Sequence, residues 1–538
     1  MTLALGRTRR LAPPLAAVAA LALLLAGCAG GAQVTRSGPA IIIGAVGPTP
    51  SLDPAGPSDQ GSLALQSQLF SGLMTTDPDT GDLEPDIAAS AAFTGPTDFT
   101  VRLRPGQRFA NGDALTSADV KFSFARQLAI KDPDGPSKDL AGLVSISTPD
   151  ADTVVFHLTS ADQTFERVLA SAVGTIVDQQ VFSATALTPN ATIVSADAFG
   201  GQYRVDSYHD TLITLEPNAD YAGYLGAPRT SSISLKLYSR SADARLDLQD
   251  GNLDIAYGLS GDDIALGAID KNLRVSQGAG AETRFLVFNL NTMPYGAAQG
   301  DADPRKALAV RQAVADLIDR EALSKAAYSG TALPLFSVVP IGQADALGTF
   351  LTEYGNGQGA SDFEAARSIL DDAGVATPVA LTLQFTPSQF GEEASDEFKE
   401  LRTQLEDAGL FTIKLQFSEY PQFTKDIAAD AYPVYQGERV SDVADPNDSL
   451  SAFRSGAPFA VHFADTTVDA EIDKAMLEPD AATRSGLVQD IQLRITAAVP
   501  VIPLLQDEQI AVSAKSVSGV VFDPRSGLRF GNLIRSGQ

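Results

Sequence analysis

The sequence has a single cysteine in 538 residues, and this scarcity limits the possible architectures. One thiol excludes a disulfide framework, a zinc site built from cysteines and a thiol redox pair. The chain must therefore be stabilised by hydrophobic cores. Because its length exceeds what one core usually supports, we expect two or three lobes.

Histidine is almost as rare, and the common catalytic patterns are absent. The sequence has no HExxH zinc motif, no GxSxG nucleophile elbow and no Walker loop. His157, His209 and His462 lie far apart in unrelated settings, so we expect them to be structural or solvated. His462, near Asp465, is a weak metal candidate because one imidazole needs further ligands. The sequence thus predicts a protein that is not an enzyme and has no cofactor or metal site.

Long apolar runs are missing beyond the amino end. Three arginines there precede an apolar run, Leu11 to Leu25, which is interrupted by Pro13 and Pro14. The run is shorter than the roughly 20 residues that a membrane-spanning helix needs. Basic residues before a short apolar segment are typical of an export signal, so we predict residues 1–27 to be a signal peptide.

Cys28 follows this run directly, in the order Leu25-Ala-Gly-Cys28, and this motif resembles a bacterial lipobox. The resemblance implies that Cys28 carries acyl chains such as palmitate. The exported protein would then be lipid-anchored at the extracytoplasmic face of the cell membrane, at the cell surface or in the periplasm. The alternative is a simple signal peptide with a buried free thiol. Residues 28–40 are small and lack periodicity, which predicts a flexible tether.

Positive charge is scarce throughout the chain. There are 39 lysines and arginines against 66 acidic residues, for a formal net charge of −27. Cleavage before Cys28 would remove three arginines and no acids, giving −30. A nucleic-acid partner is excluded, since a phosphate backbone needs a positive surface. An anionic membrane would repel the body, so we expect a soluble globule held beside the membrane by its tether.

Beyond the tether, short apolar strands and capped helices predict a mixed α/β fold. Phe99–Arg104 and Thr153–Leu158 have strand patterns in an early region rich in β structure. Thr116–Asp119 and Ser361–Glu364 match the capping box that starts a helix. Helices alternate with strands between about 300 and 505, which predicts a largely parallel sheet there.

An ordered series of stretches resembles the extracytoplasmic solute-binding proteins of peptide and nickel ABC importers, the family of oligopeptide and dipeptide receptors. The main stretches are Ser51–Ala55, Leu69–Leu73, Gly81–Pro85, Phe99–Gly106, Phe109–Asp113, Gly201–Val205, Val310–Ala313, Ile318–Leu323, Asp442–Pro446 and Val501–Leu504. The resemblance implies an α/β fold of the periplasmic-binding-protein-like type II, with two large lobes joined by a hinge and an extra subdomain in the N-terminal lobe. The implied boundaries are 41–75, 201–290 and 506–538 for lobe I, 76–200 for the extra subdomain, and 291–505 for lobe II.

The function that this resemblance implies is that of a substrate-binding lipoprotein of an ABC importer. It would capture dipeptides or oligopeptides between two closing lobes and deliver them to the membrane permease and its ATPase, as a monomer. A ligand drives such closure only by touching both lobes. A receptor for a metal chelate, haem or another small anionic solute is an alternative, as is a surface or sensor protein that no longer transports.

The implied ligand site centres on Asp442, which matches the aspartate that holds the peptide α-amine in the family. Its alternative role is a turn or helix cap, since Asp445 and Pro446 follow closely. The chain has no tryptophan, and Arg439 stands where the family has a pocket tryptophan. A guanidinium there would exchange stacking for a bidentate donor suited to a carboxylate. Alternatively, Arg439 pairs with Glu438 or another acid.

Further candidates come from both lobes. Ser58-Asp59-Gln60 matches the segment that pairs with an extended peptide in the family, a contact to the main chain that tolerates many side chains. Tyr257-Gly258 falls where the family's chain lines the cleft near the crossover. Arg284 and Arg454 are candidates for a ligand carboxylate, although each is also typical of a surface arginine.

Overall fold

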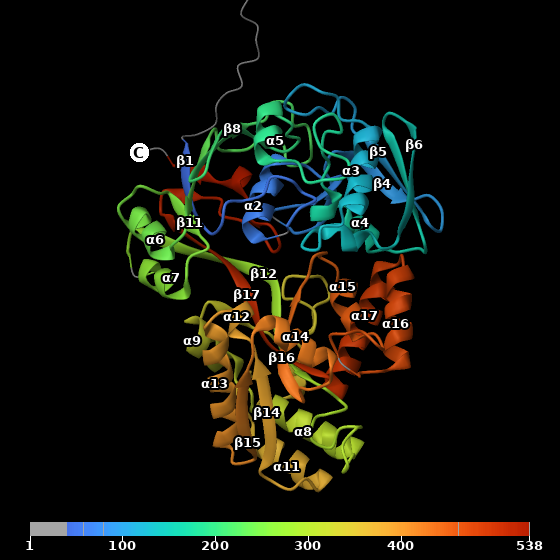
Figure 1. Ribbon diagram of the computed structural model, residues 1–538, viewed down its shortest axis with the longest axis vertical. Coiled ribbons are helices and arrows are strands. Elements are labelled where there is room, and N and C mark those ends of the chain that lie inside the picture. The colour runs from blue at the N-terminus through green and yellow to red at the C-terminus, as the bar shows by residue number, and fades with distance from the viewer. Residues whose placement is uncertain (1–39, 58, 79, 269, 461, 537–538) are drawn as a thin grey trace, which may run out of the picture. The chain divides into compact units, whose positions relative to one another are not determined.

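The computed structural model describes residues 40–57, 59–78, 80–268, 270–460 and 462–536. They belong to one compact unit, Gly38–Gln538, which has a mixed α/β structure (Figure 1). Cys28, the predicted signal peptide and most of the predicted tether lie outside the described residues, as does Ser58. Among the described residues, no helix is both long and apolar enough to cross a membrane.

An eleven-stranded sheet runs through this unit in the order β15-β14-β16-β12-β17-β11-β1-β10-β9-β8, with β13 added beside β17. Its strands are β1 (Ile41–Val46), β8 (Tyr203–His209), β9 (Leu212–Pro217), β10 (Ile233–Tyr238), β11 (Ile255–Tyr257), β12 (Leu273–Phe288), β13 (Ala332–Pro334), β14 (Val379–Phe385), β15 (Phe411–Phe417), β16 (Val434–Val440) and β17 (Val501–Ala514). Strand β1 is parallel to β10 and β11, and β14 is parallel to β15 and β16. The other neighbours in this sheet pair antiparallel.

Strands β12 and β17 connect the two halves of the sheet. They pair antiparallel along most of their sixteen and fourteen residues, with β11 beside β17 in one half and β16 beside β12 in the other. Their register shifts between Ala279 and Thr283, so the ladder is irregular where the chain passes between the halves. Each half has its own large cluster of buried apolar side chains. The protein therefore has two lobes joined by two crossover strands.

Strand β1 shows how lobe I covers both faces of its sheet. Ile41 and Ile43 are buried in a cluster with helix α2 (Gln60–Leu69). Ile42 and Val46 point the other way, against a cluster that includes residues of helices α6 (Ser241–Gln249) and α7 (Gly261–Ala268). This alternation follows from the two-residue period of a β-strand.

The extra subdomain of lobe I is a four-stranded antiparallel sheet covered by a helix. Its strands, in the order β4-β5-β7-β6, are β4 (Ala88–Phe93), β5 (Asp98–Leu103), β7 (Thr153–Leu158) and β6 (Leu143–Asp150). Phe124 of helix α3 (Ser117–Ile130) meets Phe156 of β7 edge to face, with ring centroids 5.0 Å apart. The predicted strands at 99–104 and 153–158 are confirmed as β5, shifted by one residue, and β7.

Lobe II surrounds the other half of the sheet with helices. They include α8 (Pro304–Leu317), α9 (Arg320–Tyr328), α11 (Phe363–Ala373), α13 (Glu393–Asp407), α14 (Tyr420–Ala428), α16 (Thr466–Leu477) and α17 (Ala481–Ala498). The predicted parallel arrangement is confirmed for β15, β14 and β16, but the crossover strands that complete this half are antiparallel to their neighbours. The chain enters lobe II along β12 and returns to lobe I along β17, so these two strands run in opposite directions.

The two predicted capping boxes have different outcomes. At α3 the box is present: the Thr116 hydroxyl accepts from the backbone of Ala118, and the Asp119 carboxylate accepts from the Thr116 backbone N–H. At α11 the prediction was wrong by one residue. Asp362, not Ser361, is the N-cap there, and its carboxylate accepts from the Ala365 backbone N–H. A carboxylate suits the positive end of a helix and competes well with a neighbouring hydroxyl.

We expect Thr116→Ala to lower the free energy of unfolding by about 1 kcal/mol, because the first turn of α3 loses its side-chain acceptor. Ser361→Ala is the matched control, since Ser361 does not cap α11; its effect should stay within about 0.5 kcal/mol. Urea unfolding followed by circular dichroism compares the two variants. Equal losses in both would contradict this assignment of caps.

Candidate functional site

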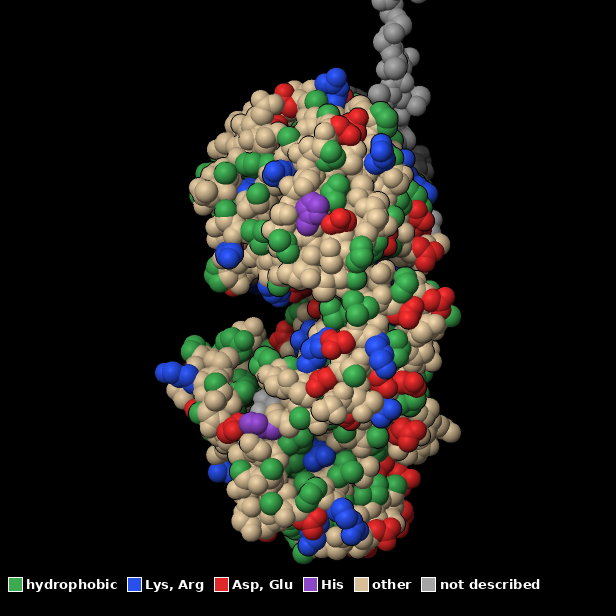
Figure 2. Space-filling view, turned by 90° about the vertical axis from the view of Figure 1, so that its right-hand side faces the viewer, with side chains coloured by type: hydrophobic (Ala, Val, Ile, Leu, Met, Phe, Trp, Pro, Cys, Tyr) green, Lys and Arg blue, Asp and Glu red, His purple; other side chains and the backbone are tan. Residues whose placement is uncertain are grey.

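A cavity of about 530 Å³ is lined by residues of both lobes. Lobe I contributes one face of α2, the hairpin of β2 (Met74–Thr76) and β3 (Leu83–Pro85), residues 170–172 and Thr175, and part of the segment 522–532. Lobe II contributes residues 340–344 and the loop after β16, while Gly280 and Ala281 come from the crossover itself. The space-filling view shows a deep notch in the surface between the lobes (Figure 2). A molecule held in this cavity would touch both lobes.

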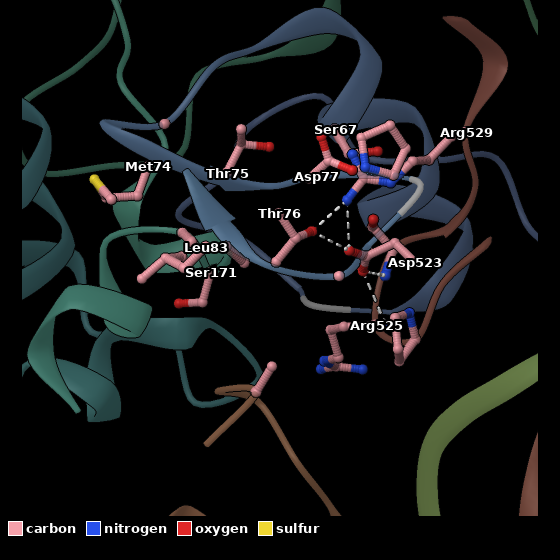
Figure 3. Close-up of a pocket in the computed structure, with 18 of the residues that line it drawn as sticks. Ser67, Met74, Thr75, Thr76, Asp77, Leu83, Ser171, Asp523, Arg525 and Arg529 are labelled. Carbon is pink, nitrogen blue, oxygen red and sulfur yellow. Dashed lines mark hydrogen bonds and ion pairs between the residues drawn. The ribbon is translucent and has the colours of Figure 1, made fainter. Parts of the chain in front are cut away.

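The carboxyl-terminal segment gives the lobe I wall a network of charged groups (Figure 3). Asp523 accepts hydrogen bonds from the Arg529 guanidinium at 3.0 Å and from the Thr76 hydroxyl at 3.3 Å. Its other oxygen accepts the backbone N–H groups of Arg525 and Ser526. Burial acts to raise the pKa of Asp523, but Arg529 and these backbone donors together hold it below its ordinary value. The carboxylate is therefore ionised and anchors a tight turn.

Asp442 brings a second carboxylate into the cavity, from the loop that follows β16. One of its oxygens lies 2.9 Å from the Arg525 guanidinium and the other 2.5 Å from the Lys138 ammonium. Both cations belong to lobe I, so these ion pairs cross the boundary between the lobes. The Asp442 side chain is only 16% exposed. A carboxylate with so little hydration needs cationic partners, and here the protein's own side chains supply them.

The loop that carries Asp442 is also packed against lobe I. Val443 is buried in the hydrophobic cluster of the extra subdomain, and Asp445 lies 3.6 Å from Arg167 of that subdomain. Asp445 also pairs with Arg484 at 2.6 Å and caps helix α15 (Pro446–Leu450). The capping role that was an alternative for Asp442 thus belongs to Asp445.

A neighbouring acid responds to this charge. Asp139 has its pKa raised to about 7, first because it is largely buried and second because Asp442 lies nearby. Lys138, the preceding residue, opposes the shift. The charge on Asp442 therefore makes Asp139 harder to ionise.

Of the predicted ligand residues within the described chain, Asp442 alone lines this cavity. Asp59 is the N-cap of α2, where it accepts from the backbone and hydroxyl of Ser62, and Gln60 donates to Gln509. Tyr257 ends β11, and Gly258 follows it with a φ of +72°. These four residues belong to lobe I and lie outside the cavity lining.

The three predicted arginines also have partners within the protein. Arg439 donates to the backbone oxygen of Asp448 at 3.2 Å and lies over the Phe459 ring, so its partner acid is Asp448 rather than Glu438. Arg284 pairs with Glu282 at 2.9 Å, and its guanidinium lies over the Tyr328 ring. Arg454 pairs with Asp473 at 2.6 Å.

His462, the weak metal candidate, does not contact Asp465 as its neighbour. His462 contacts the Asp430 carboxylate at 2.8 Å, and Asp465 instead caps α16. No group of three or more candidate metal ligands occurs within the described ranges.

Sequence reasoning missed the cationic side of the site. Arg525, Arg529 and Lys138 are far from Asp442 along the chain, and no motif connects them. The turn around Asp523-Pro524 has a recognisable signal, an aspartate before proline. That signal predicts a turn, but it does not predict that the turn lines the cavity.

The fold agrees with the comparisons to known proteins. Residues 82–460 match the family model of bacterial extracellular solute-binding proteins, family 5 Middle. The chain belongs to this family. It is the solute-binding component of an ABC importer with a type II periplasmic-binding-protein fold, and not an enzyme.

Individual relatives are distant but cover nearly the whole chain. The probable D,D-dipeptide-binding periplasmic protein DdpA of Escherichia coli (strain K12) is 24% identical over 498 residues, which are 90% of this chain and 92% of the relative. The glutathione-binding protein GsiB of Salmonella typhi is 23% identical over 505 residues, 89% of this chain and 91% of the relative.

Among solved structures, the periplasmic murein tripeptide binding protein MppA in its unliganded open form superposes with a TM-score of 0.79 at 18% identity. The superposition covers 93% of this chain and 97% of that one. A putative peptide binding protein, AppA from Clostridium difficile, superposes with a TM-score of 0.75 at 18% identity, over 93% and 100%.

Proposed function

We propose that this protein captures short peptides between its lobes and delivers them to the permease and ATPase of an ABC importer. The observation that carries the proposal is the cavity of about 530 Å³, which both lobes line and which includes the Asp442 carboxylate. A guest that touches both walls binds the closed arrangement more tightly than an open one, and so shifts the population toward closure. The names of the relatives, which refer to dipeptide, glutathione and tripeptide, support a peptide as the ligand class.

Within this proposal, Asp442 accepts the α-ammonium of the peptide. The group has three N–H donors and carries a full charge, so it can replace a cation that now pairs with this carboxylate. Arg439 donates a hydrogen bond to the Asp448 backbone outside the cavity lining, and the proposal gives it no ligand contact. Asp59, Gln60, Tyr257, Gly258, Arg284 and Arg454 likewise lie outside the cavity lining, and the proposal gives them no ligand contact.

Native mass spectrometry of the purified protein, followed by denaturation and fragmentation of whatever is released, tests the proposal. We expect small peptides among the released molecules. Calorimetric titration with a library of free dipeptides and tripeptides gives an independent answer. A released ligand without peptide bonds, together with no binding from the library, would contradict the function.

The proposal includes export and acylation at Cys28, which lies outside the described residues. Two acyl chains on the cysteine would hold a body of strongly negative charge at a membrane that otherwise repels it. We expect the wild-type protein to incorporate labelled palmitate and to partition with membranes, and Cys28→Ser to do neither. Peptide binding by the soluble body should be unchanged in that variant. Membrane partition of Cys28→Ser at the wild-type level would rule out the anchor.

A further inference from the structure

Three side chains on the outer face of the extra subdomain form a continuous chain of hydrogen bonds. The His157 ring lies between the other two, with Nδ1 2.8 Å from an Asp98 carboxylate oxygen and Nε2 2.8 Å from the Ser147 hydroxyl. None of the three lines the cavity between the lobes. Serine, histidine and aspartate linked in this order have the connectivity of a nucleophile, a base and the group that orients the base.

The four-stranded sheet places these residues by its strand register. Asp98 begins β5 and is directly opposite His157 of β7, and Ser147 lies on β6, on the other side of β7. Side chains alternate between the two faces of a sheet, and the neighbouring Phe99 and Phe156 are buried in the core of the subdomain. The three polar side chains therefore share the opposite, outer face.

The Asp98 carboxylate determines which ring nitrogen of His157 carries the proton in the neutral imidazole. An ionised carboxylate only accepts hydrogen bonds, so Nδ1 holds the proton and donates it to Asp98. Nε2 then has an unprotonated lone pair, to which the Ser147 hydroxyl donates. This is the tautomer in which a histidine can take the serine proton as a general base.

The serine hydroxyl is accessible from solvent. Ser147 is exposed, and the His157 and Asp98 side chains are 34% and 46% exposed. Val155 of β7 is directly opposite Ser147 in the register and is half-buried on the same outer face. Its methyl groups offer an apolar surface to the acyl part of an ester beside the hydroxyl. An acyl donor in solution can thus reach Ser147 without any change in the fold.

We propose that Ser147 is an acyl-acceptor site, which takes one acyl group from an activated ester with His157 as general base and Asp98 as the residue that positions the base. The Ser147 oxygen forms a bond to the acyl carbon, and the bond from that carbon to the leaving oxygen breaks. The serine proton passes through His157 to the leaving group. The product is an ester of an alkyl hydroxyl, which is less reactive than the activated donor and therefore accumulates. The site is thus one of covalent modification without turnover, separate from peptide capture.

The reagent for the test is p-nitrophenyl acetate, because the release of p-nitrophenolate can be followed by absorbance. We expect the wild-type protein to release a single equivalent in a rapid phase, and peptide mapping by mass spectrometry to locate the acetyl group on Ser147. A positioned general base contributes about 10²- to 10⁴-fold, so Ser147 should react on the order of 100-fold faster than exposed serines without a histidine partner. An acetyl group absent from Ser147 would overturn the proposal without any variant.

Variants separate the roles of the three groups, with circular dichroism to check that each is folded. Ser147→Ala should abolish the rapid phase, and His157→Gln should slow it about 100-fold. Asp98→Ala should slow it on the order of 10-fold, because the ring loses the partner that fixes its tautomer. Asp98→Glu keeps a carboxylate and should restore part of the rate. A wild-type rate in His157→Gln would contradict base catalysis and with it the proposal.

Ser145→Ala is the matched control. Ser145 is exposed two residues away on β6 and is directly opposite His157 in the register, yet the ring bonds to Ser147. We expect the rapid phase and the position of the acetyl group to be unchanged in this variant. Equal losses in Ser145→Ala and Ser147→Ala would show that the hydrogen-bonded chain does not select the reactive serine, and the proposal would fail.

Discussion

Asp53→Ala is expected to lower the free energy of unfolding by about 3 to 5 kcal/mol, the usual result of removing one partner from a buried ion pair. Asp53 and Arg126 are each about 1% exposed and form two parallel hydrogen bonds of 2.8 Å. Asp53 also accepts the backbone N–H of Thr188 at 2.6 Å. Alanine would leave the Arg126 guanidinium buried without a counterion and the Thr188 N–H without an acceptor.

This effect should be global, because the pair joins separate parts of lobe I. Asp53 lies in the loop after β1, whereas Arg126 belongs to α3 of the extra subdomain. Chemical unfolding followed by fluorescence and circular dichroism measures the loss. Asp396→Ala is the control, since Asp396 pairs with Lys399 at an exposed position and should cost no more than about 1 kcal/mol. If the two variants lose equal stability, the buried pair does not have the role described.

Asp442→Ala is expected to weaken the binding of peptides with a free amino terminus on the order of 100-fold, because a charge-assisted hydrogen bond to a poorly hydrated carboxylate is lost. N-acetylated peptides lack the ammonium, so their weaker binding should change little. Isothermal titration with each peptide and its acetylated form separates these cases. Folding should be nearly intact, since Asp442 lies at the lobe boundary rather than in a core.

The matched control for this prediction is Asp82→Ala. Asp82 is an exposed acid in the wall of the same cavity, so its removal changes the net charge equally. We expect a change of about threefold or less, the effect of a screened surface charge. Equal losses in the two variants would mean that the cavity responds to total charge and that Asp442 is not the specific anchor.

Local sequence patterns predicted secondary structure well where one short-range interaction decides it. The capping box at Thr116 and the strand at Thr153–Leu158 are found as expected. Errors occurred where two neighbours compete for the same role. Asp362, not Ser361, caps α11. The positive end of the helix favours the carboxylate over the hydroxyl there.

The candidate site was harder to predict. Asp442, which lines the cavity, was singled out through the family resemblance, because the residues around it form a continuous motif. Arg439 was placed by the same motif, yet its side chain turns to Asp448 and Phe459 behind the wall. A motif gives the backbone position of a residue. The direction of a long side chain depends on which partners the fold brings near it.

By itself, the sequence determined the class of this protein, through its alternating helices and strands and an ordered series of motifs that resemble one family. These features depend on residues close together in the chain. Only the tertiary structure decided which charges meet in the cavity. Arg525 and Lys138 reach Asp442 because two crossover strands bring the lobes together, and no local pattern encodes a contact between residues so far apart in the chain.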